Sequence, residues 1–166
     1  MNFNIKTGPT LLGVLVTTLT ILFDQLSKWW ILNVVMVPPK VIEITKFFDL
    51  VLVYNRGASF GIFSNSPDWV SFALIVFAIL ISIALAIWMW HADGNLLAFA
   101  LALVAGGAVG NVIDRIRLGA VVDFLDLHVG GWHWPAFNIA DSAITIGVRL
   151  LILDSFKLKS GNSYIY

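Results

Sequence analysis

The fold of this chain is decided by one apolar stretch, WVSFALIVFAILISIALAIWMW, which runs from Trp69 to Trp90. A helix rises about 1.5 Å per residue, so a stretch of this length crosses the roughly 30 Å of hydrocarbon in a bilayer. Three further apolar stretches are long enough or nearly so, and they cover about 11–35, 96–113 and 136–153. We therefore predict an all-α membrane protein with four transmembrane helices.

The composition agrees with a membrane as the solvent. Of the 166 residues, 59% are hydrophobic and only 12% are charged, which leaves more apolar surface than a water-soluble domain of this size could bury. The formal net charge is zero, so no basic balance points to a nucleic-acid partner. The absence of cysteine excludes disulfides, thiolate metal sites and a cysteine nucleophile.

The first apolar stretch is expected to be a retained span and not a signal peptide. It follows Lys6, but it continues through Asp24 and Lys28 without a small-residue cleavage site. Tryptophans, which favour membrane interfaces, mark the ends of the predicted spans; they are Trp29, Trp30, Trp69, Trp88, Trp90, Trp132 and Trp134. With no internal repeat or linker, we expect a single integral membrane domain over residues 1–166.

Four antiparallel spans bring most of the polar residues to one side of the membrane. These residues are Asp24, Lys28, the loop 54–61, Asn111, Asp114, Arg115, Asp123, Asn138 and Asp141. Asp141 lies about 8 Å inside the fourth predicted span, and Asp24 lies about 20 Å along the first, which gives both a similar depth. We expect a polar site just below one membrane surface.

Asp123 and Asp141 are the candidate catalytic pair. Asp123 lies in the β-favouring segment VVDFLD (121–126), where its neighbours are bulky and apolar. Two carboxylates that meet where water is scarce share one proton, so that one can act as a base on water and the other as an acid toward a carbonyl. Independent aspartates, solvated or salt-bridged, are the alternative.

Other polar residues on this side have a structural and a functional interpretation. Asp24 and Lys28 are four residues apart on a helix, so they could neutralise each other as a structural pair, or contact a substrate. Asn111 and Arg115 have the same spacing, and could cap and anchor the helix, or orient a carboxylate.

The remaining motifs favour structural roles. Gly106 and Gly110 form a small-xxx-small pair that lets two helices approach closely. His128 and His133 lie in a loop rich in glycine and tryptophan with no cluster of further ligands, so interfacial anchoring is favoured over a zinc site.

Four blocks of the sequence resemble, in the same order, the signature blocks of the lipoprotein signal peptidase (signal peptidase II) family. They are DQLSK (24–28), YNRGASFG (54–61), GGAVGNVIDR (106–115) continuing to VVDF (121–124), and FNIAD (137–141). With the four spans, these blocks cover nearly the whole chain. The resemblance implies a membrane aspartyl peptidase that removes the signal peptide from diacylglyceryl-modified prolipoproteins, cutting before the lipid-modified cysteine.

The same resemblance implies roles for individual residues. Asp123 and Asp141 would form the catalytic dyad. The residues that would bind substrate or support the site are Asp24, Lys28, Asn55, Gly57, Asn111, Asp114, Arg115, Asn138 and Ala140. We expect no metal and no organic cofactor. A small β-rich extracytoplasmic cradle is also implied, and residues 41–53 could supply it, since they are rich in Val, Ile and Phe. Arg149 departs from the family pattern and bears only on where the last helix ends.

By this resemblance the protein is a multi-pass protein of the bacterial inner membrane, with its active site near the periplasmic face. Lipidated prolipoproteins and membrane lipid are the expected partners, globomycin is the expected inhibitor, and we expect a monomer. The basic residues point to the opposite orientation: the predicted outer segments hold Lys40, Lys46, Arg56, Arg115 and Arg117, and the inner ones Lys6, Lys157 and Lys159. We keep the family topology because several of the outer basic residues belong to the motif blocks.

Two other classes of function are compatible with a small polar membrane protein. One is an ion- or proton-coupled carrier, in which Asp24, Asp114 and Asp141 would bind the ion within the bundle. The other is a non-catalytic assembly factor that holds lipidated partners. A carrier needs polar residues at both membrane faces, whereas this sequence has them at one, so we favour the peptidase.

Overall fold

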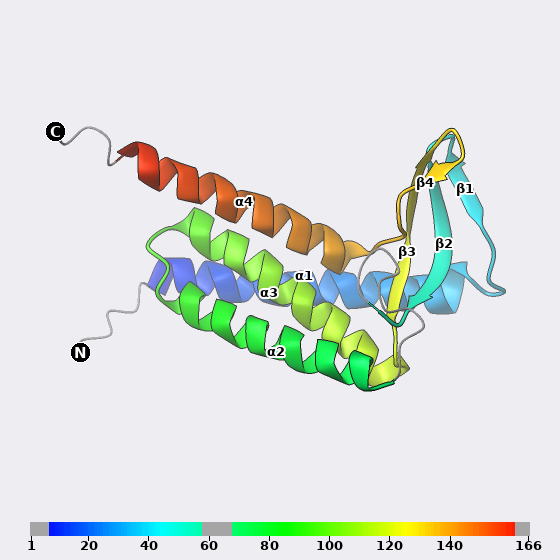
Figure 1. The fold of residues 1–166 in the computed structure, drawn as a ribbon, viewed down its shortest axis with the longest axis horizontal. Helices are drawn as coiled ribbons and strands as arrows, with labels where there is room; N and C mark the ends of the chain where they lie inside the picture. Colours follow the sequence, from blue (N-terminus) through cyan, green and yellow to red (C-terminus); the bar gives the residue numbers. More distant parts are fainter. Residues whose placement is uncertain (1–6, 58–67, 162–166) are drawn as a thin grey trace.

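The computed structural model describes residues 7–57 and 68–161. Four long helices run alongside one another, and a small sheet stands at one end of them (Figure 1). In chain order the elements are α1 (Thr7–Trp30), a π-helical turn η1 (Ile31–Val35), β1 (Ile42–Thr45), β2 (Phe48–Asn55), α2 (Asp68–Trp90), α3 (Asn95–Leu118), β3 (Val121–Val129), β4 (Trp132–His133) and α4 (Ile139–Gly161). The start of α1 and the end of α4 lie at the end away from the sheet.

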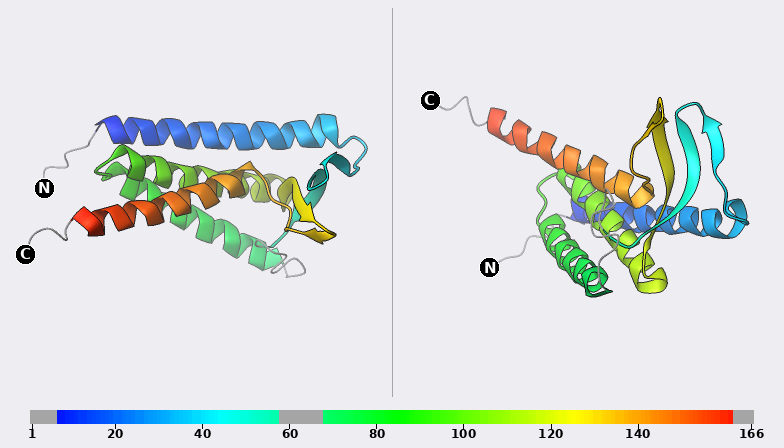
Figure 2. Two further views of the ribbon diagram at one scale, coloured as in Figure 1. Left: turned by 90° about the horizontal axis from the view of Figure 1, so that it is seen from above. Right: turned by 45° about the vertical axis from the view of Figure 1, so that its right-hand side comes forward.

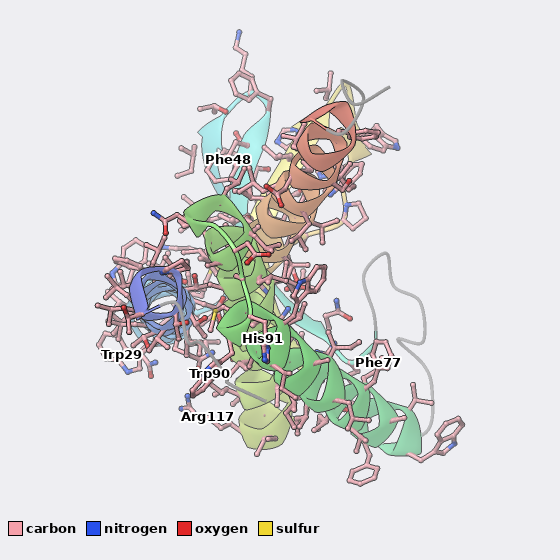
Figure 3. The ribbon with its side chains drawn as sticks, turned by 90° about the vertical axis from the view of Figure 1, so that its left-hand side faces the viewer. Trp29, Phe48, Phe77, Trp90, His91 and Arg117 are labelled. Atoms are coloured by element: carbon pink, nitrogen blue, oxygen red, sulfur yellow. The ribbon has the colours of Figure 1, made fainter. Side chains whose placement is uncertain are left out.

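Three of the described helical stretches are long and apolar enough to cross a membrane. They are Thr7–Val35, Trp69–Trp90 and Asn95–Leu118, which correspond to the first three predicted spans. Large side chains on their outer faces are exposed: Trp29 on α1 is 57% exposed, and Phe77 on α2 is 63% exposed (Figure 3). Large apolar side chains exposed in this way along helices of such length indicate a lipid environment.

The fourth helix differs from the predicted span 136–153. It begins at Ile139 and continues to Gly161, and it is not among the candidate spans because charged residues interrupt its apolar sequence. Its late start follows from Asn138, whose side-chain Oδ1 accepts the main-chain N–H of Asp141 at 2.9 Å and so caps the helix. Asp141 therefore lies in the first turn of α4 and not five residues inside a span.

The third helix is longer than predicted. The apolar run ends near residue 113, but α3 continues through Asp114 and Arg115 to Leu118. Gly119 then ends the helix in the left-handed conformation, with a φ of 72° and its N–H donating to the carbonyl of Arg115. Glycine adopts this conformation without a steric penalty, which makes it the common residue at such helix ends.

The sheet is antiparallel, with the strand order β1-β2-β3-β4. It confirms the prediction of β-structure in residues 41–53 and 121–126, and two further views place it at the same end of the helices (Figure 2). Its inner part packs on η1 and on the residue after it, where Ile31, Met36, Val122 and Phe124 form a buried cluster. Trp132, predicted to precede the fourth span as an interfacial residue, lies in β4 of the sheet, paired with Val129.

Glycines of α3 let the other helices approach it closely. A Cβ added to Gly106 would lie 2.8 Å from Cβ of Thr20 on α1, and one added to Gly107 would lie 2.4 Å from the carbonyl oxygen of Ala140 on α4. A Cβ on Gly110 would lie 2.6 Å from a carboxylate oxygen of Asp24. The packing role predicted for Gly106 and Gly110 is thus confirmed.

Candidate active site

Asp123 is buried at the start of β3 and held by two amides. Its side chain accepts hydrogen bonds from Nδ2 of Asn138 at 2.7 Å and from Nδ2 of Asn55 at 3.0 Å. Asn55 ends β2, whose register places Val53 opposite Asp123. The strand pairing therefore brings the loop after β2 to a carboxylate that lies 68 residues away in the chain.

Asp141 reaches the same place from the first turn of α4. One of its carboxylate oxygens accepts a hydrogen bond from Nδ2 of Asn111 at 2.8 Å. Asn138 connects the two aspartates, since its amide nitrogen donates to Asp123 and its amide oxygen accepts the N–H of Asp141. Asn138, which caps α4, thus also donates a hydrogen bond to the carboxylate of Asp123.

The charge of Asp141 acts on the carboxyl group of Asp123. Burial raises the pKa of Asp123, and the negative charge of Asp141 raises it further, to about 7. Hydrogen bonds from Asn55 and Asn138 and the charge of Lys28 act in the opposite direction. A carboxyl group with a pKa near neutrality can both hold and release a proton under ordinary conditions.

Beneath the two aspartates lies a buried ion network centred on Lys28. Its Nζ is 2.8 Å from Asp24 and 2.8 Å from Asp114, and it donates to Oδ1 of Asn111 at 3.1 Å. The structural pairing predicted for Asp24 and Lys28 is confirmed, and Asp114 joins it. Burying these charges is tolerable only because each has an opposite charge and further hydrogen bonds.

The two acidic partners of Lys28 also fix the surrounding elements. Asp24 accepts the main-chain N–H of Ala140 at 3.0 Å, so its negative charge lies at the N-terminal end of α4, where the helix dipole favours it. Asp114 accepts the main-chain N–H of Val122 at 3.1 Å and thereby ties α3 to β3. Each carboxylate thus anchors an element that carries one of the two central aspartates.

Asn111 and Arg115 have different roles. Asn111 holds a carboxylate, as the functional interpretation of this pair proposed. Arg115 instead donates to the carbonyl of Gly57 at 2.8 Å, and the N–H of Gly57 donates to Oδ1 of Asn55 at 3.1 Å. Arg115 therefore holds the loop after β2 and makes no hydrogen bond to a carboxylate among the contacts of the described residues. Residues 58–61 of the same motif lie outside the described residues.

Hydrogen bonds and ion pairs connect all of the predicted site residues into one network. The connected residues are Asp24, Lys28, Asn55, Gly57, Asn111, Asp114, Arg115, Asp123, Asn138, Ala140 and Asp141. In the part of the chain that the structure describes, no group of three or more His, Cys, Asp or Glu side chains could hold a metal ion. The network lies where α1, α3, α4 and the sheet meet.

Sequence reasoning missed Gln25. Its Nε2 lies within hydrogen-bonding distance of Asp114 at 3.0 Å, and of both Asp24 and the carbonyl of Gly110 at 3.2 Å. It therefore bridges the two carboxylates that share Lys28. The available signal was its position directly after Asp24 in the first block, but an amide on a helix is more often a surface residue than a buried ligand.

Comparison with known proteins agrees with this geometry. A family model described as Signal peptidase (SPase) II matches residues 16–157.

The chain belongs to the signal peptidase II family.

Named members of the family are similar over most of the chain. The lipoprotein signal peptidase of Burkholderia ambifaria is 47% identical over 148 residues, which is 89% of each protein. That of Burkholderia vietnamiensis is also 47% identical, over 147 residues and 88% of each protein. Membership of the family identifies a peptidase. The peptidase is therefore a better interpretation than the carrier or the assembly factor.

Solved structures share the fold. A bacterial membrane enzyme superposes with a TM-score of 0.78 at 33% identity, covering 93% of both chains. A second structure, also described as a bacterial membrane enzyme, gives a TM-score of 0.74 at 34% identity and covers 87% of this chain and 92% of the other. The apolar helices and these neighbours together establish a membrane protein.

Proposed function

We propose that this protein is an aspartic endopeptidase that removes the signal peptide from diacylglyceryl-modified prolipoproteins, cutting before the lipid-modified cysteine. One observation carries the proposal: Asp123 and Asp141, from β3 and α4, are both bound by the side chain of Asn138 at one end of a membrane helix bundle, and Asn55 and Asn111 hold them further. Membership of the signal peptidase II family and the likeness to lipoprotein signal peptidases support this substrate class.

In the proposed mechanism the two carboxyl groups share one proton. The ionised carboxylate takes a proton from water as the water oxygen attacks the scissile carbonyl carbon, and the protonated carboxyl donates its proton to the carbonyl oxygen. Collapse of the tetrahedral intermediate breaks the C–N bond, and a proton passes to the departing amine of the cysteine. The raised pKa of Asp123, about 7, supports a dyad that is half protonated near neutral pH.

The surrounding residues would hold this dyad without reacting. Asn55, Asn111 and Asn138 orient the carboxylates by donating to them. Asp24, Lys28 and Asp114 form the ion network below, which fixes the ends of α3 and α4. Arg115 positions Gly57, whose backbone would line the space for the small residues that precede the cut. Ala140, with its side chain buried beside Gly110, keeps the same space narrow.

We further propose that α4 is a fourth membrane span, so that residues 1–166 form one multi-pass domain of the bacterial inner membrane, acting as a monomer. Gly147 on α4 packs against the carbonyl of Ala100 on α3, so the two helices accompany each other from Asn111 to Ala100 of α3. The sheet would then be an extracytoplasmic cradle and the active site would lie near the periplasmic face. Membrane lipid and lipidated prolipoproteins are the proposed partners.

Incubation of the purified protein with a diacylglyceryl-modified prolipoprotein tests the proposal, with release of the signal peptide as the readout. Asp123→Asn and Asp141→Asn keep the shape of the side chains but remove the proton transfer, so each should lower the rate by about 100-fold or more. Asp154→Asn is the matched control, since this aspartate also lies on α4 but about 20 Å further along the helix than Asp141, and it should cleave normally.

Two outcomes would contradict the proposal. Failure of the wild-type protein to release a signal peptide would remove the activity itself. Near-normal cleavage by either dyad variant would leave the activity but remove the aspartic mechanism. Melting of each variant in detergent must match the wild type within a few degrees, so that a loss of rate reports on chemistry and not on folding.

A further inference from the structure

Two buried carboxylates of the ion network each bind the backbone directly before one aspartate of the proposed dyad. Asp114 accepts the main-chain N–H of Val122, and the next residue of β3 is the first dyad aspartate. Asp24 accepts the main-chain N–H of Ala140, and the next residue of α4 is the second dyad aspartate. Any contact that holds these two carboxylates together therefore also holds the two halves of the dyad.

Lys28 is the charged bridge between the two carboxylates, and it uses one oxygen of each. Its Nζ lies 2.8 Å from Oδ2 of Asp24 and 2.8 Å from Oδ2 of Asp114. A lysine ammonium is a point charge on a flexible stem, so it attracts both groups without fixing the angle between them. One positive charge also leaves part of the repulsion between two negative charges. A second contact is needed to hold the pair in one arrangement.

Gln25 makes this second contact, and it is uncharged. Its Nε2 lies 3.0 Å from Oδ1 of Asp114 and 3.2 Å from Oδ2 of Asp24. Among the described residues, no other group lies within hydrogen-bonding distance of Oδ1 of Asp114. A carboxylate that is bound at both oxygens is held in rotation as well as in position, which is how outer hydrogen bonds orient the groups of a site.

The orientation of the Gln25 amide is determined by contacts at both of its ends. Nη1 of Arg117, near the end of α3, lies 3.4 Å from the amide oxygen (Figure 3). At the amide nitrogen, the carbonyl oxygen of Gly110 lies 3.2 Å away, in addition to the two carboxylates. A cation next to the oxygen and three acceptors around the nitrogen agree on one assignment of the amide atoms. Gln25 therefore acts as a donor toward both carboxylates.

We propose that Gln25 is a positioning residue of the proposed peptidase reaction: by bridging Asp24 and Asp114 beside Lys28, it sets how far apart β3 and α4 hold the two dyad carboxyl groups. The effect on cleavage rests on the proposed function. Gln25 makes no hydrogen bond to either dyad aspartate among the contacts of the described residues, so it acts through the two carboxylates. Loss of the bridge should slow the chemical step and leave substrate binding unchanged.

Gln25→Met tests the bridge, because methionine keeps the length and the helix preference of the side chain but cannot donate. Hydrogen exchange of the purified protein in detergent is read at the main-chain N–H groups of Val122 and Ala140. Both should exchange about tenfold faster in the variant, the scale of a hydrogen bond to a charged group. In signal-peptide release, kcat should fall about tenfold or more, with KM within twofold of the wild type.

Thr18→Val is the matched control on the same helix. Its side chain is exposed and its hydroxyl donates to the carbonyl of Val14 within α1, so exchange, kcat and KM should equal those of the wild type. The N–H of Leu101, buried in α3, should exchange equally in every variant that is folded. Gln25→Asn is the milder variant, since it keeps the amide one methylene further from the carboxylates. It should shift kcat and exchange in the same direction by a smaller factor, and it decides the question if Gln25→Met does not fold.

Exchange does not require activity, so the bridge and the proposed function can fail separately. An inactive wild type would remove the function, while faster exchange of Val122 and Ala140 in Gln25→Met would still support the bridge. Unchanged exchange at both amides would overturn the proposal. So would a lower melting temperature with an unchanged kcat, which would show a merely structural role. A higher KM at an unchanged kcat would place Gln25 in substrate binding and would overturn it as well.

Discussion

The two central carboxylates are held by amides and not by cations. Asn55 and Asn138 donate to Asp123, and Asn111 donates to Asp141. An amide orients a carboxylate without neutralising it, whereas a lysine in direct contact would lower its pKa strongly. The one lysine of the network, Lys28, is already paired with two other carboxylates. This division of roles leaves burial and the mutual repulsion of the pair free to raise the pKa of Asp123.

The pH dependence of cleavage should report this arrangement. A dyad that works with one shared proton loses it as the pH rises, so kcat/KM should fall on the alkaline side around the pKa of Asp123, about 7. The hydrogen bond from Asn55 stabilises the charged form and lowers this pKa. Asn55→Ala should therefore move the alkaline limb upward, by about one pH unit for a hydrogen bond to a charged group.

The pH profile of kcat/KM for the wild type and Asn55→Ala makes this measurement. Asn33→Ala is the control, since this exposed residue of η1 donates from its amide to the carbonyl of Trp29, four residues earlier. Its alkaline limb should coincide with that of the wild type. If the alkaline limb of the Asn55→Ala profile stays in place or moves to lower pH, the role given to this hydrogen bond is contradicted.

Sequence motifs predicted which residues gather at the proposed site, but not how these residues contact one another. Asp123 and Asp141 were predictable as a pair from residue type and family resemblance. Their link through Asn138 could not be predicted, because it depends on one amide that both caps α4 and donates a hydrogen bond to Asp123. Gln25 was missed for a similar reason. Two of its acceptors, Gly110 and Asp114, lie on α3, and they follow Gln25 in the chain by 85 and 89 residues. Such contacts depend on helix packing, which residue order alone does not specify.

Among the elements, α3 is the one against which the others are placed. Its glycines lie against two different helices, Gly106 against α1 and Gly107 against α4, while Gly110 lies against Asp24 and Ala140 together. The absence of side chains at these positions brings the backbones close enough for Lys28 to reach Asp114 and for Asn111 to reach Asp141. Close helix packing is therefore a condition for the geometry of the site.

Gly107→Ala should disturb this packing. The added Cβ would lie 2.4 Å from the carbonyl oxygen of Ala140, a backbone atom that cannot turn aside, so α4 must move away from α3. We expect a loss of about 1–3 kcal/mol in stability, typical of overpacking, and a loss of cleavage because Asp141 moves away from Asn111. Thermal unfolding in detergent and signal-peptide release measure the two effects.

Gly8→Ala is the control for this substitution. No atom lies within 4 Å of the Cβ that it would add at the start of α1, and alanine favours a helix over glycine by about 1 kcal/mol. Its melting temperature should stay the same or rise, with normal cleavage. If Gly107→Ala behaved like Gly8→Ala, then the close approach of α3 and α4 would not be needed for either stability or activity.

The element ends that sequence reasoning placed wrongly are those that polar contacts decide. The predicted third span ended near 113 because Asp114 and Arg115 read as the end of an apolar run, yet both stay helical because Lys28 and Gly57 are their partners. The predicted fourth span began early because Asn138 was read as part of it and not as its cap. The pairing of β2 with β3 joins segments about 70 residues apart, and only their β-favouring composition was visible in advance.

Over the whole molecule, the proposed site lies near one end of the bundle and the sheet closes that end (Figure 1). Asn111 precedes the end of α3 at Leu118 by seven residues, which is about 10 Å along the helix, and follows its start at Asn95 by about 24 Å. The sidedness predicted from four antiparallel spans agrees with this gathering of polar residues. In the proposed topology the site would be reached from one membrane surface, at a depth of about 10 Å.

This depth predicts that the lipid on the substrate decides whether it is cut. A peptide bond in a soluble segment stays in water, above a dyad that the proposed topology places about 10 Å below the surface. A diacylglyceryl group on the cysteine holds the bond down, since each buried methylene contributes about 0.8 kcal/mol and two acyl chains supply far more than a stable anchor needs. We expect the same prolipoprotein to be cleaved at least about 100-fold faster with the lipid than without it.

Paired assays of the lipidated and unlipidated prolipoprotein, in liposomes and in detergent, measure this preference. Because anchoring acts through depth, the preference should be larger in liposomes, where a bilayer defines the surface, than in small micelles, where water approaches the site more closely. In liposomes, a substrate with shortened acyl chains should be cleaved at a rate between those of the lipidated and the unlipidated prolipoprotein. Equal cleavage with and without lipid in both media would mean that the peptide alone reaches the dyad, and then neither depth nor anchoring would set the specificity of this site.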